Sequence, residues 1–279
     1  MAEFPPGLVW LASYPKSGNT WLRVLLANLM AGRDEPADIN NLSEEETLLG
    51  RWRFGDDTLV DADLLHWREL ERMRPMHCDF AAAGLACLSF CKTHDRFLGR
   101  AGEPVLGMRA RGAIYAVRDP RDVAISLSHH NSVNLEQAIH IMADPMRRST
   151  VDGPLVRYLL GDWDSHVTGW TDQRLVPVKV VRYEDLRQDT AAVLAEIVAF
   201  LGARATTAEI GRAVVHSSLD ELQRQETAKG FRETRPGQRR FFRTGRVGEW
   251  RDVLAPHQVR TIEQRFGPVM ARWGYATEG

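Results

Sequence analysis

Short apolar runs and amphipathic helical stretches alternate along the 279 residues of the chain. Four runs have the length and composition of buried strands, at residues 8–12, 85–91, 113–117 and 178–181. Apolar residues recur at helical spacing between them, most clearly over 22–30 and 191–201. This alternation predicts an α/β fold in which helices flank a central parallel sheet.

The turn after the first apolar run has the composition of an anion-binding loop. The predicted strand ends at Tyr14, and Lys-Ser-Gly-Asn-Thr follows at 16–20, directly before a predicted helix. Helix N-termini present unpaired backbone N–H groups and the positive end of the helix dipole. Lys16 adds an ammonium in a chain whose 36 basic residues include only four lysines. The segment therefore predicts a phosphate cradle. An ordinary strand–turn–helix corner, capped by Ser17 or Asn19, is the alternative.

The third apolar run leads into a second anion-binding pattern. Arg118 directly follows the predicted strand. Asp119 and Pro120 have the residue types of a helix N-cap and a first helical position. Arg118 is therefore expected to leave the strand tip toward the same edge of the sheet as Lys16. The alternative is that Arg118 pairs with neighbouring carboxylates on the surface.

Two further segments carry candidate chemistry. His94 lies just beyond the second apolar run, and the loop 241–250 is basic and contains two glycines. Lys16, His94 and Arg118 each follow the carboxyl end of a predicted strand, where open α/β sheets bind ligands. A solvated histidine and a mobile surface loop are the ordinary alternatives.

These motifs together resemble the sulfotransferases that use 3′-phosphoadenosine 5′-phosphosulfate (PAPS). Residues 14–21, Tyr-Pro-Lys-Ser-Gly-Asn-Thr-Trp, resemble the phosphosulfate-binding loop of that family, and Lys-Thr-His at 92–94 resembles its catalytic segment. Arg118, followed eight residues later by Ser126, matches the family's pattern for holding the 3′-phosphate. The first loop is not a standard ATP-type P-loop, because no glycine precedes Lys16 at the required spacing.

The loop 241–250 resembles the family's C-terminal nucleotide loop. Arg243 and Gly245 match its pattern, whereas Thr244 stands where the family usually has a lysine. The resemblance covers most of the chain, from about residue 9 to residue 250.

The resemblance implies a P-loop NTPase-like sulfotransferase fold and in-line transfer of a sulfuryl group. PAPS would be the donor and 3′-phosphoadenosine 5′-phosphate (PAP) the product, with no metal required. His94 would be the general base that takes the proton of an acceptor hydroxyl, and Lys16 and Lys92 would neutralise charge at the transferred group. The implied nucleotide-binding residues are Lys16, Ser17, Gly18, Asn19, Thr20, Trp21, Arg118, Ser126, Tyr183, Ser217, Arg243, Thr244 and Gly245.

We expect one domain over residues 1–279, because a chain of this length with 44% hydrophobic residues can bury a substantial core. The segments 32–76 and 131–158 are predicted to form helical walls of the acceptor site. The Arg- and Gly-rich segment 223–246 is predicted to be a mobile lid over the nucleotide. A small-molecule acceptor is expected, with phenols, sugars, lipid headgroups and peptide antibiotics all open. The oligomeric state is open as well.

Composition argues against several other classes of protein. Cys78, Cys87 and Cys91 lack C-x-x-C spacing and the histidines form no H-E-x-x-H cluster, so we expect no metal site and a reducing compartment. The formal net charge of −1 and the scattered basic residues give no sign of nucleic-acid binding. No apolar run is long enough to span a membrane, and the N-terminus lacks the basic region of a signal peptide, which favours the cytoplasm.

Two other functions stay open. A P-loop kinase acting on a small metabolite with Mg-ATP needs a Ser or Thr directly after Gly-Lys and an acidic strand end for the metal, and neither pattern is present. The second is a non-catalytic nucleotide-binding protein that has kept the loops. In such a protein, replacing His94 would leave nucleotide affinity unchanged and would have no other effect.

Overall fold

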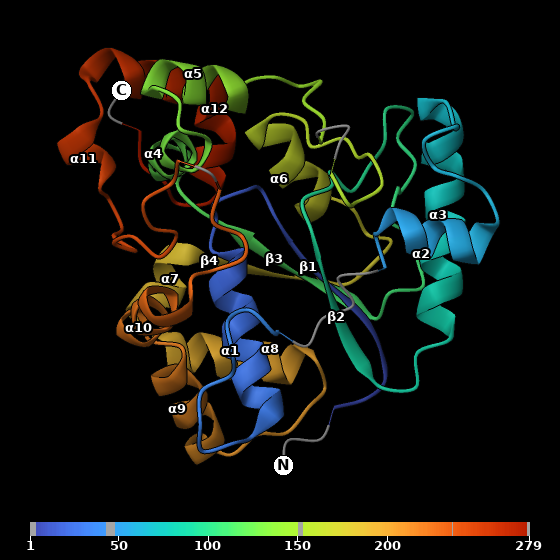
Figure 1. The fold of residues 1–279 in the computed structure, drawn as a ribbon. Helices are drawn as coiled ribbons and strands as arrows, with labels where there is room; N and C mark the ends of the chain where they lie inside the picture. The colour runs from blue at the N-terminus through green and yellow to red at the C-terminus, as the bar shows by residue number, and fades with distance from the viewer. Residues whose placement is uncertain (1–3, 43–47, 150–152, 236, 278–279) are drawn as a thin grey trace.

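The computed structural model describes residues 4–42, 48–149, 153–235 and 237–277 (Figure 1). Within these residues four parallel strands form one sheet in the order β2-β1-β3-β4. The strands are β1 (Gly7–Ser13), β2 (Leu88–Thr93), β3 (Gly112–Val117) and β4 (Val178–Arg182). The predicted parallel sheet is confirmed.

Helices cover both faces of this sheet (Figure 1). The helices are α1 (Asn19–Ala31), α2 (Arg51–Thr58), α3 (Trp67–Ala83), α4 (Pro120–Asn131), α5 (Leu135–Met142), α6 (Trp163–Thr171), α7 (Tyr183–Gln188), α8 (Thr190–Phe200), α9 (Thr207–His216), α10 (Leu219–Lys229), α11 (Trp250–Val253) and α12 (Pro256–Arg272). Side chains of α1, α8 and α9 join the core on one face, and those of α3, α4, α5, α6 and α12 join it on the other. The architecture is a three-layer α/β/α arrangement.

The central strand β1 is apolar along its whole length because it is buried on both faces. Leu8 and Trp10 pack into one core layer, whereas Val9 and Leu11 pack into the other. All four are at most 1% exposed. Alternate side chains of a strand point to opposite faces, so a strand between two helical layers needs apolar residues at every position.

The strands end together at one edge of the sheet. Ala12 of β1 pairs with Thr93 at the end of β2, and Ser13 pairs with Ala116 of β3. Val117 at the end of β3 pairs with Arg182, the last residue of β4. The residues that follow each strand therefore meet along one rim, as parallel topology requires.

The predicted strands agree with the observed ones to within three residues. The largest difference is at β2, which begins at Leu88 rather than at residue 85. Its partner β1 begins at Gly7, which pairs with Leu88, so residues 85–87 have no strand beside them. Asp119 and Pro120 are the N-cap and first residue of α4, as predicted.

The segment 223–246, predicted to be a mobile lid, begins within a helix. Its first seven residues belong to α10, whose Leu222 and Gln225 are buried. The helix was missed because its exposed face is strongly polar and only a few of its residues reach the core. The following residues, 230–249, contain no regular element among those described. Their mobility stays a prediction.

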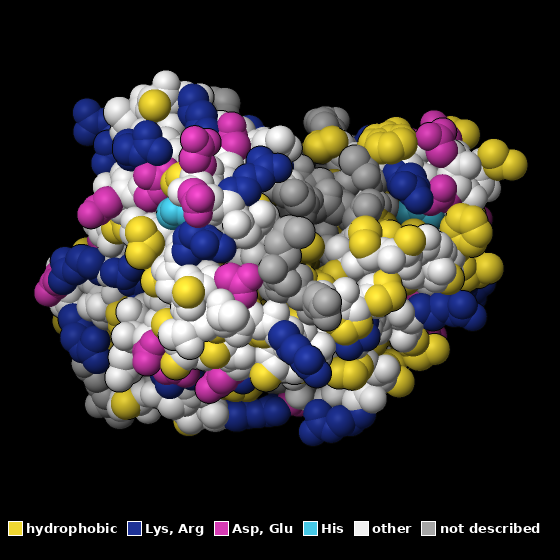
Figure 2. Space-filling model, turned by 90° about the horizontal axis from the view of Figure 1, so that it is seen from below, with side chains coloured by type: hydrophobic (Ala, Val, Ile, Leu, Met, Phe, Trp, Pro, Cys, Tyr) yellow, Lys and Arg dark blue, Asp and Glu magenta, His cyan; other side chains and the backbone are white. Residues whose placement is uncertain are grey.

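Helices α2 and α3 form a protruding part of the molecule beside β2 (Figure 1). They carry several exposed apolar side chains, of which Trp52, Met76 and Phe80 are more than half exposed. Seen from below, apolar side chains gather on this side of the molecule, among scattered arginines or lysines (Figure 2). Both helices lie in or beside the segment 32–76 that the sequence assigns to the acceptor walls. Residues 43–47 of that segment lie outside the described residues.

Candidate active site

A cavity of about 1010 Å³ opens at the rim where the strands end. It is lined by residues that follow β1, β2 and β3, by Tyr183 at the start of α7, and by the loop 240–245. All predicted site residues except Ser17 and Ser217 line it. Segments more than 200 residues apart in the sequence thus share one cavity.

The loop after β1 has a backbone shape that exposes its N–H groups. Lys16 has a φ of 72° and Gly18 a φ of 99°, and Gly18 is the N-cap of α1 without a side-chain cap. A Cβ on Gly18 would lie 2.7 Å from Cδ2 of Tyr183, so glycine is required there by both backbone and space. Asn19 Nδ2 donates to the Leu11 carbonyl at 2.8 Å and fixes the loop against β1.

Buried polar atoms in this region suit an anionic ligand. Ser17 Oγ, Asn19 Oδ1 and Arg118 Nε have no hydrogen-bond partner among the described residues, although each is shielded from solvent. Buried polar groups are seldom left unpaired, and two of these three atoms are donors. Donors without acceptors beside the start of a helix are what phosphate oxygens require. The residues present therefore fit the phosphate groups of a nucleotide.

Lys16 is held in a site that disfavours its charge. Its Nζ lies 4.1 Å from the centre of the Phe241 ring. Burial is the main cause that lowers the pKa of Lys16 to about 7; Glu233 opposes the shift, and the nearby charges of Lys92, Arg118 and Arg235 contribute to it. A bound anion would supply the missing counter-charge.

His94 presents one ring nitrogen to the cavity in a defined state. Its Nδ1 lies 2.8 Å from the Ser13 carbonyl oxygen, which can only accept, so Nδ1 carries the proton. Burial, helped by Lys92, lowers the pKa of His94 to about 3, so the ring is neutral. Nε2 is then an unprotonated base, and it has no hydrogen-bond partner among the described residues. The His94 carbonyl lies 3.2 Å from Nε2 of His166, which packs behind the site.

Arg118 connects three parts of the nucleotide-binding region. Its guanidinium donates to the carbonyls of Lys16 at 3.3 Å and Arg246 at 3.0 Å, and it lies 4.4 Å from the centre of the Tyr183 ring. Asp122, four residues on, lies 3.8 Å from the same guanidinium. Lys16 and Arg118 therefore lie together at one edge of the sheet, as the sequence predicts.

Asp122 also fixes the C-terminal loop. Its two carboxylate oxygens accept from the backbone N–H groups of Gly248 at 2.8 Å and Trp250 at 3.0 Å. Tyr183 holds the same loop, because its hydroxyl donates to the Gly245 carbonyl at 3.1 Å. The sequence analysis did not predict this role, because Asp122 enters there only as one of the carboxylates neighbouring Arg118.

Arg243 is engaged within its own loop. Its two guanidinium nitrogens each lie 2.8 Å from a carboxylate oxygen of Glu249, and Thr244 Oγ1 lies 3.5 Å from the same carboxylate. Arg243 and Thr244 both line the cavity. Glu249 therefore competes with any phosphate for the Arg243 fork.

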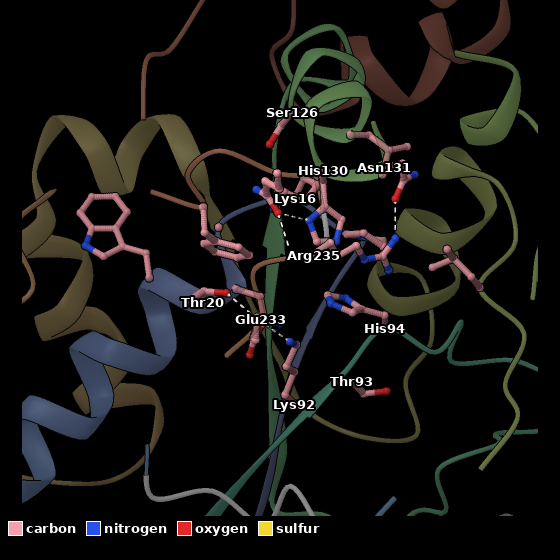
Figure 3. A pocket seen from close by; sticks show the side chains of 18 of the residues that line it. Lys16, Thr20, Lys92, Thr93, His94, Ser126, His130, Asn131, Glu233 and Arg235 are labelled. Carbon is pink, nitrogen blue, oxygen red and sulfur yellow. Dashed lines mark hydrogen bonds and ion pairs between the residues drawn. The ribbon is translucent and has the colours of Figure 1, made fainter. Parts of the chain in front are cut away.

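Glu233 is the main site residue that the sequence reasoning missed. Its carboxylate lies 3.0 Å from Lys92 Nζ and 3.5 Å from Thr20 Oγ1 (Figure 3). It also lies 2.5 Å from Arg23 Nη1. Despite burial, these cations lower the pKa of Glu233 to about 2. A sequence signal existed, because Glu233 is the one carboxylate in the basic stretch between Lys229 and Glu249. The carboxylate thus contacts Lys92 and Thr20, two of the predicted site residues.

The remaining predicted residues lie in or under the cavity wall. Ser126 and Trp21 line it, and Trp21 packs edge-on against Tyr183 with ring centres 6.0 Å apart. Ser217 is fully buried outside the lining, where its Oγ accepts from Asn28 Nδ2 at 3.0 Å and its carbonyl accepts from Trp21 Nε1 at 2.9 Å. Ser217 thus orients the Trp21 ring rather than facing the cavity.

The described residues contain no cluster of three or more His, Cys, Asp or Glu side chains that could hold a metal ion. No helix in the described part of the chain is long and apolar enough to cross a membrane.

Unpaired buried donors and a neutral imidazole at the rim of a parallel sheet suit an enzyme that transfers a group from a nucleotide. Residues 6–274 match the family model described as the sulfotransferase domain, so the chain belongs to the sulfotransferase family. It is therefore an enzyme that takes a sulfuryl group from PAPS and leaves PAP.

Individual relatives agree with this assignment. Cytosolic sulfotransferase 14 of Arabidopsis thaliana is 28% identical over 267 residues, which cover 92% of this chain and 73% of the relative. Luciferin sulfotransferase of Photinus pyralis is 26% identical over 294 residues, with 96% and 73% covered. The crystal structure of a retinol dehydratase in complex with androsterone and inactive cofactor PAP matches with a TM-score of 0.63 and 21% identity, over 94% of this chain and 80% of that one. That last match shows a shared fold, and the predicted P-loop NTPase-like sulfotransferase fold is confirmed.

Proposed function

We propose that this sulfotransferase moves the sulfuryl group to a hydroxyl of a small molecule, with His94 as the general base. The observation that carries the proposal is the hydrogen bond from His94 Nδ1 to the Ser13 carbonyl, which leaves Nε2 as the basic nitrogen at the cavity. A base with its lone pair on the reacting side and its other nitrogen held by the backbone is oriented for proton transfer.

Proton transfer to His94 depends on what else is bound. In the structure the imidazole pKa is about 3, because burial and the Lys92 charge oppose a second proton. Anionic groups bound in the cradle would offset the charges of Lys16 and Lys92 and raise the basicity of Nε2. His94 is thus a weak base in the free enzyme and a stronger one when the donor is bound.

Lys16 and Lys92 are proposed to stabilise the charge that develops during transfer. When bound, PAPS supplies the sulfuryl group, whose S–O bond to the 5′-phosphate breaks as the acceptor oxygen bonds to sulfur. Lys16, at the start of the cradle, would neutralise charge on the departing phosphate oxygen. Lys92 would exchange its partner Glu233 for an anionic oxygen.

The nucleotide is proposed to bind to residues that follow β1 and β3 and to the C-terminal loop. Arg118, with Nε unpaired, and Ser126 would hold the 3′-phosphate. Trp21 and Tyr183 would contact the base, and the loop that includes Gly245 would cover it. The arrangement favours an adenosine bisphosphate over Mg-ATP, because the described residues near the cradle supply no carboxylate cluster for magnesium.

Calorimetric titration with PAP and, separately, with Mg-ATP tests the nucleotide assignment. We expect PAP to bind without metal, and Arg118→Gln to weaken that binding at least about tenfold through loss of a bidentate charge pair. Tight binding of Mg-ATP with no binding of PAP would favour a kinase instead.

His94→Gln tests the role of the base. With labelled PAPS and a panel of phenols and alcohols as acceptors, this change should lower kcat by about 10²–10⁴ while PAP affinity stays within about twofold. His140→Gln is the matched control, since His140 is exposed on α5 and does not line the cavity. Unchanged turnover in His94→Gln would remove His94 from the mechanism. Loss of PAP binding in that variant would instead assign His94 to the nucleotide site.

A cytoplasmic location remains our expectation. It is supported by the cytosolic names of several relatives.

A further inference from the structure

The cavity is strongly cationic beyond what the nucleotide needs. Eleven Lys and Arg side chains line it against three carboxylates. Each carboxylate already has a basic partner: Asp95 lies 2.6 Å from Arg74, Glu233 lies 3.0 Å from Lys92, and Glu249 lies 2.8 Å from Arg243. Among the other lining cations, Arg147, Arg148 and Arg235 have no carboxylate partner in the described part of the chain.

Three of the remaining arginines, Arg147, Arg148 and Arg235, are not among the predicted nucleotide-binding residues. Arg147 and Arg148 belong to the segment 131–158, which the sequence assigns to the acceptor. Arg147 Nη1 donates to the Tyr14 hydroxyl at 3.4 Å, and the Arg148 guanidinium lies 4.5 Å from the Trp67 ring centre at the start of α3. Neither pairs with a carboxylate anywhere in the described chain.

Arg235 lines the cavity between Lys16 and the segment that carries Arg147 and Arg148. It donates to Asn131 Oδ1 at 2.7 Å, and Figure 3 shows its guanidinium turned toward Asn131 on the same side of the cavity as His94. Arg235 too has no carboxylate partner among the residues described. Tyr158 lines the same cavity as Arg147 and Arg235. Burial and the Asp95 charge raise the pKa of Tyr158 to about 12, while the charges of Arg147, Arg74 and Arg235 act in the opposite direction.

Strand order separates His94 from part of the nucleotide region. Arg118 and Tyr183 follow β3 and β4, whereas His94 follows β2, at the other end of the strand order. Arg147 contacts Tyr14, directly after β1, and Arg148 contacts Trp67 at the start of α3. A molecule that places its hydroxyl near His94 on that side would bring its own body against these cations.

We infer that the acceptor carries an acidic group as well as the hydroxyl that is sulfated, and that Arg147, Arg148 and Arg235 bind that group. This inference rests on the proposed function of the same site. Closing the cavity around a neutral molecule would leave these guanidinium groups desolvated without a counter-charge, which is unfavourable. An anionic acceptor removes that penalty, and guanidinium forks suit carboxylate and phosphate oxygens alike.

The other walls indicate the body to which the acid is attached. Trp52 of α2 lines the cavity and is 58% exposed. The Tyr158 hydroxyl, neutral at physiological pH, has no hydrogen-bond partner among the described residues. An aromatic face and a neutral donor beside three cations suit a hydroxylated ring that bears a carboxylate or a phosphate.

The test uses matched pairs of compounds on the full-length protein saturated with PAP. Affinity-selection mass spectrometry compares hydroxy acids with their primary amides, such as 4-hydroxyphenylacetate with 4-hydroxyphenylacetamide. A second arm compares phosphate esters with their parents, such as glucose 6-phosphate with glucose. The acid should be retained at least about tenfold more strongly than its neutral partner. The two arms tell carboxylate from phosphate.

Variants tie any preference to the named residues. The double change Arg147→Gln with Arg148→Gln should reduce the preference about tenfold while PAP affinity and retention of neutral compounds stay unchanged. Arg174→Gln is the control, because Arg174 is exposed before β4, at the opposite edge of the sheet from the cavity.

Equal retention of both members of the pairs, preference for the neutral member, or retention of no acid would overturn the inference. So would an acid preference that survives in the double variant. A protein that fails to bind PAP at all would instead contradict the proposed function. Loss of PAP affinity in the double variant would assign these arginines to the nucleotide.

Discussion

Nucleotide binding should draw a proton from solution at Lys16. In the free protein the Lys16 pKa is about 7, mainly because the side chain is buried. Phosphate oxygens favour the charged ammonium, so the pKa rises when PAP binds. Between the free and the bound pKa, each molecule of PAP that binds brings up to one proton with it.

The size of the effect follows from the free pKa. At pH 8 only about one tenth of the free protein has Lys16 charged, so uptake approaches ~0.9 proton per PAP bound, against ~0.5 at pH 7. The association constant should fall about fivefold from pH 7 to pH 8. Above pH 7 the phosphates of PAP are almost fully ionised, because their second pKa is about 6, and contribute little.

Calorimetry in two buffers of different ionisation enthalpy measures the proton uptake directly. Lys16→Arg keeps the charge but does not titrate in this range, so its PAP affinity should be flat between pH 7 and 8. His94→Asn controls for proton binding by the imidazole and should retain the uptake. The reasoning is refuted if the wild type takes up no proton at pH 8, or if Lys16→Arg takes up as much as the wild type.

Three further changes have definite expected outcomes. Gly18→Ala should lower the free energy of unfolding by about 1–3 kcal/mol and weaken PAP binding, because the left-handed φ and the Tyr183 ring both oppose a Cβ; thermal melts and calorimetry check this. Glu233→Gln should bind PAP more tightly. Because the Glu233 pKa is lowered to about 2, the carboxylate stabilises the folded protein fully above about pH 5 and progressively less toward pH 2. The difference in free energy of unfolding between wild type and variant, up to about 3 kcal/mol, should therefore disappear over that pH range in thermal melts. Ser217→Ala should cost about 1 kcal/mol in stability through loss of the Asn28 hydrogen bond and leave PAP affinity within about twofold; a large loss of affinity would return Ser217 to the nucleotide site.

The fold was predictable because its signals are local. Each strand is a short apolar run that ends at a turn. A strand buried on both faces requires apolar residues at nearly every position. The turn at Lys16 and the cap at Asp119 are also set by neighbours in sequence. Parallel pairing then brings Lys16, His94 and Arg118 to one rim without further information.

The parts that were missed depend on contacts between distant segments. Glu233 meets Lys92 across 141 residues, and Asp122 meets Trp250 across 128. No periodicity or turn pattern records such a contact. Ser217 has a matching residue type for the family's base-binding position, but its side chain is turned inward toward Asn28. Side-chain direction at the end of a helix depends on packing that the sequence pattern does not specify.

The two sides of the cavity are built from different kinds of chain. The nucleotide side stands on strand ends, where the register of the sheet allows little variation in position. Arg147, Arg148 and Trp52 stand instead on connections outside the sheet, and one of these connections spans 131–158. On the proposed function, exchanging a connecting segment should change acceptor specificity while the sheet and the proposed donor site stay as they are. For protein engineering, the sheet is a fixed scaffold and the connecting segments are its exchangeable parts. Chimaeras that exchange residues 131–158 between relatives are the direct way to seek new acceptor specificities.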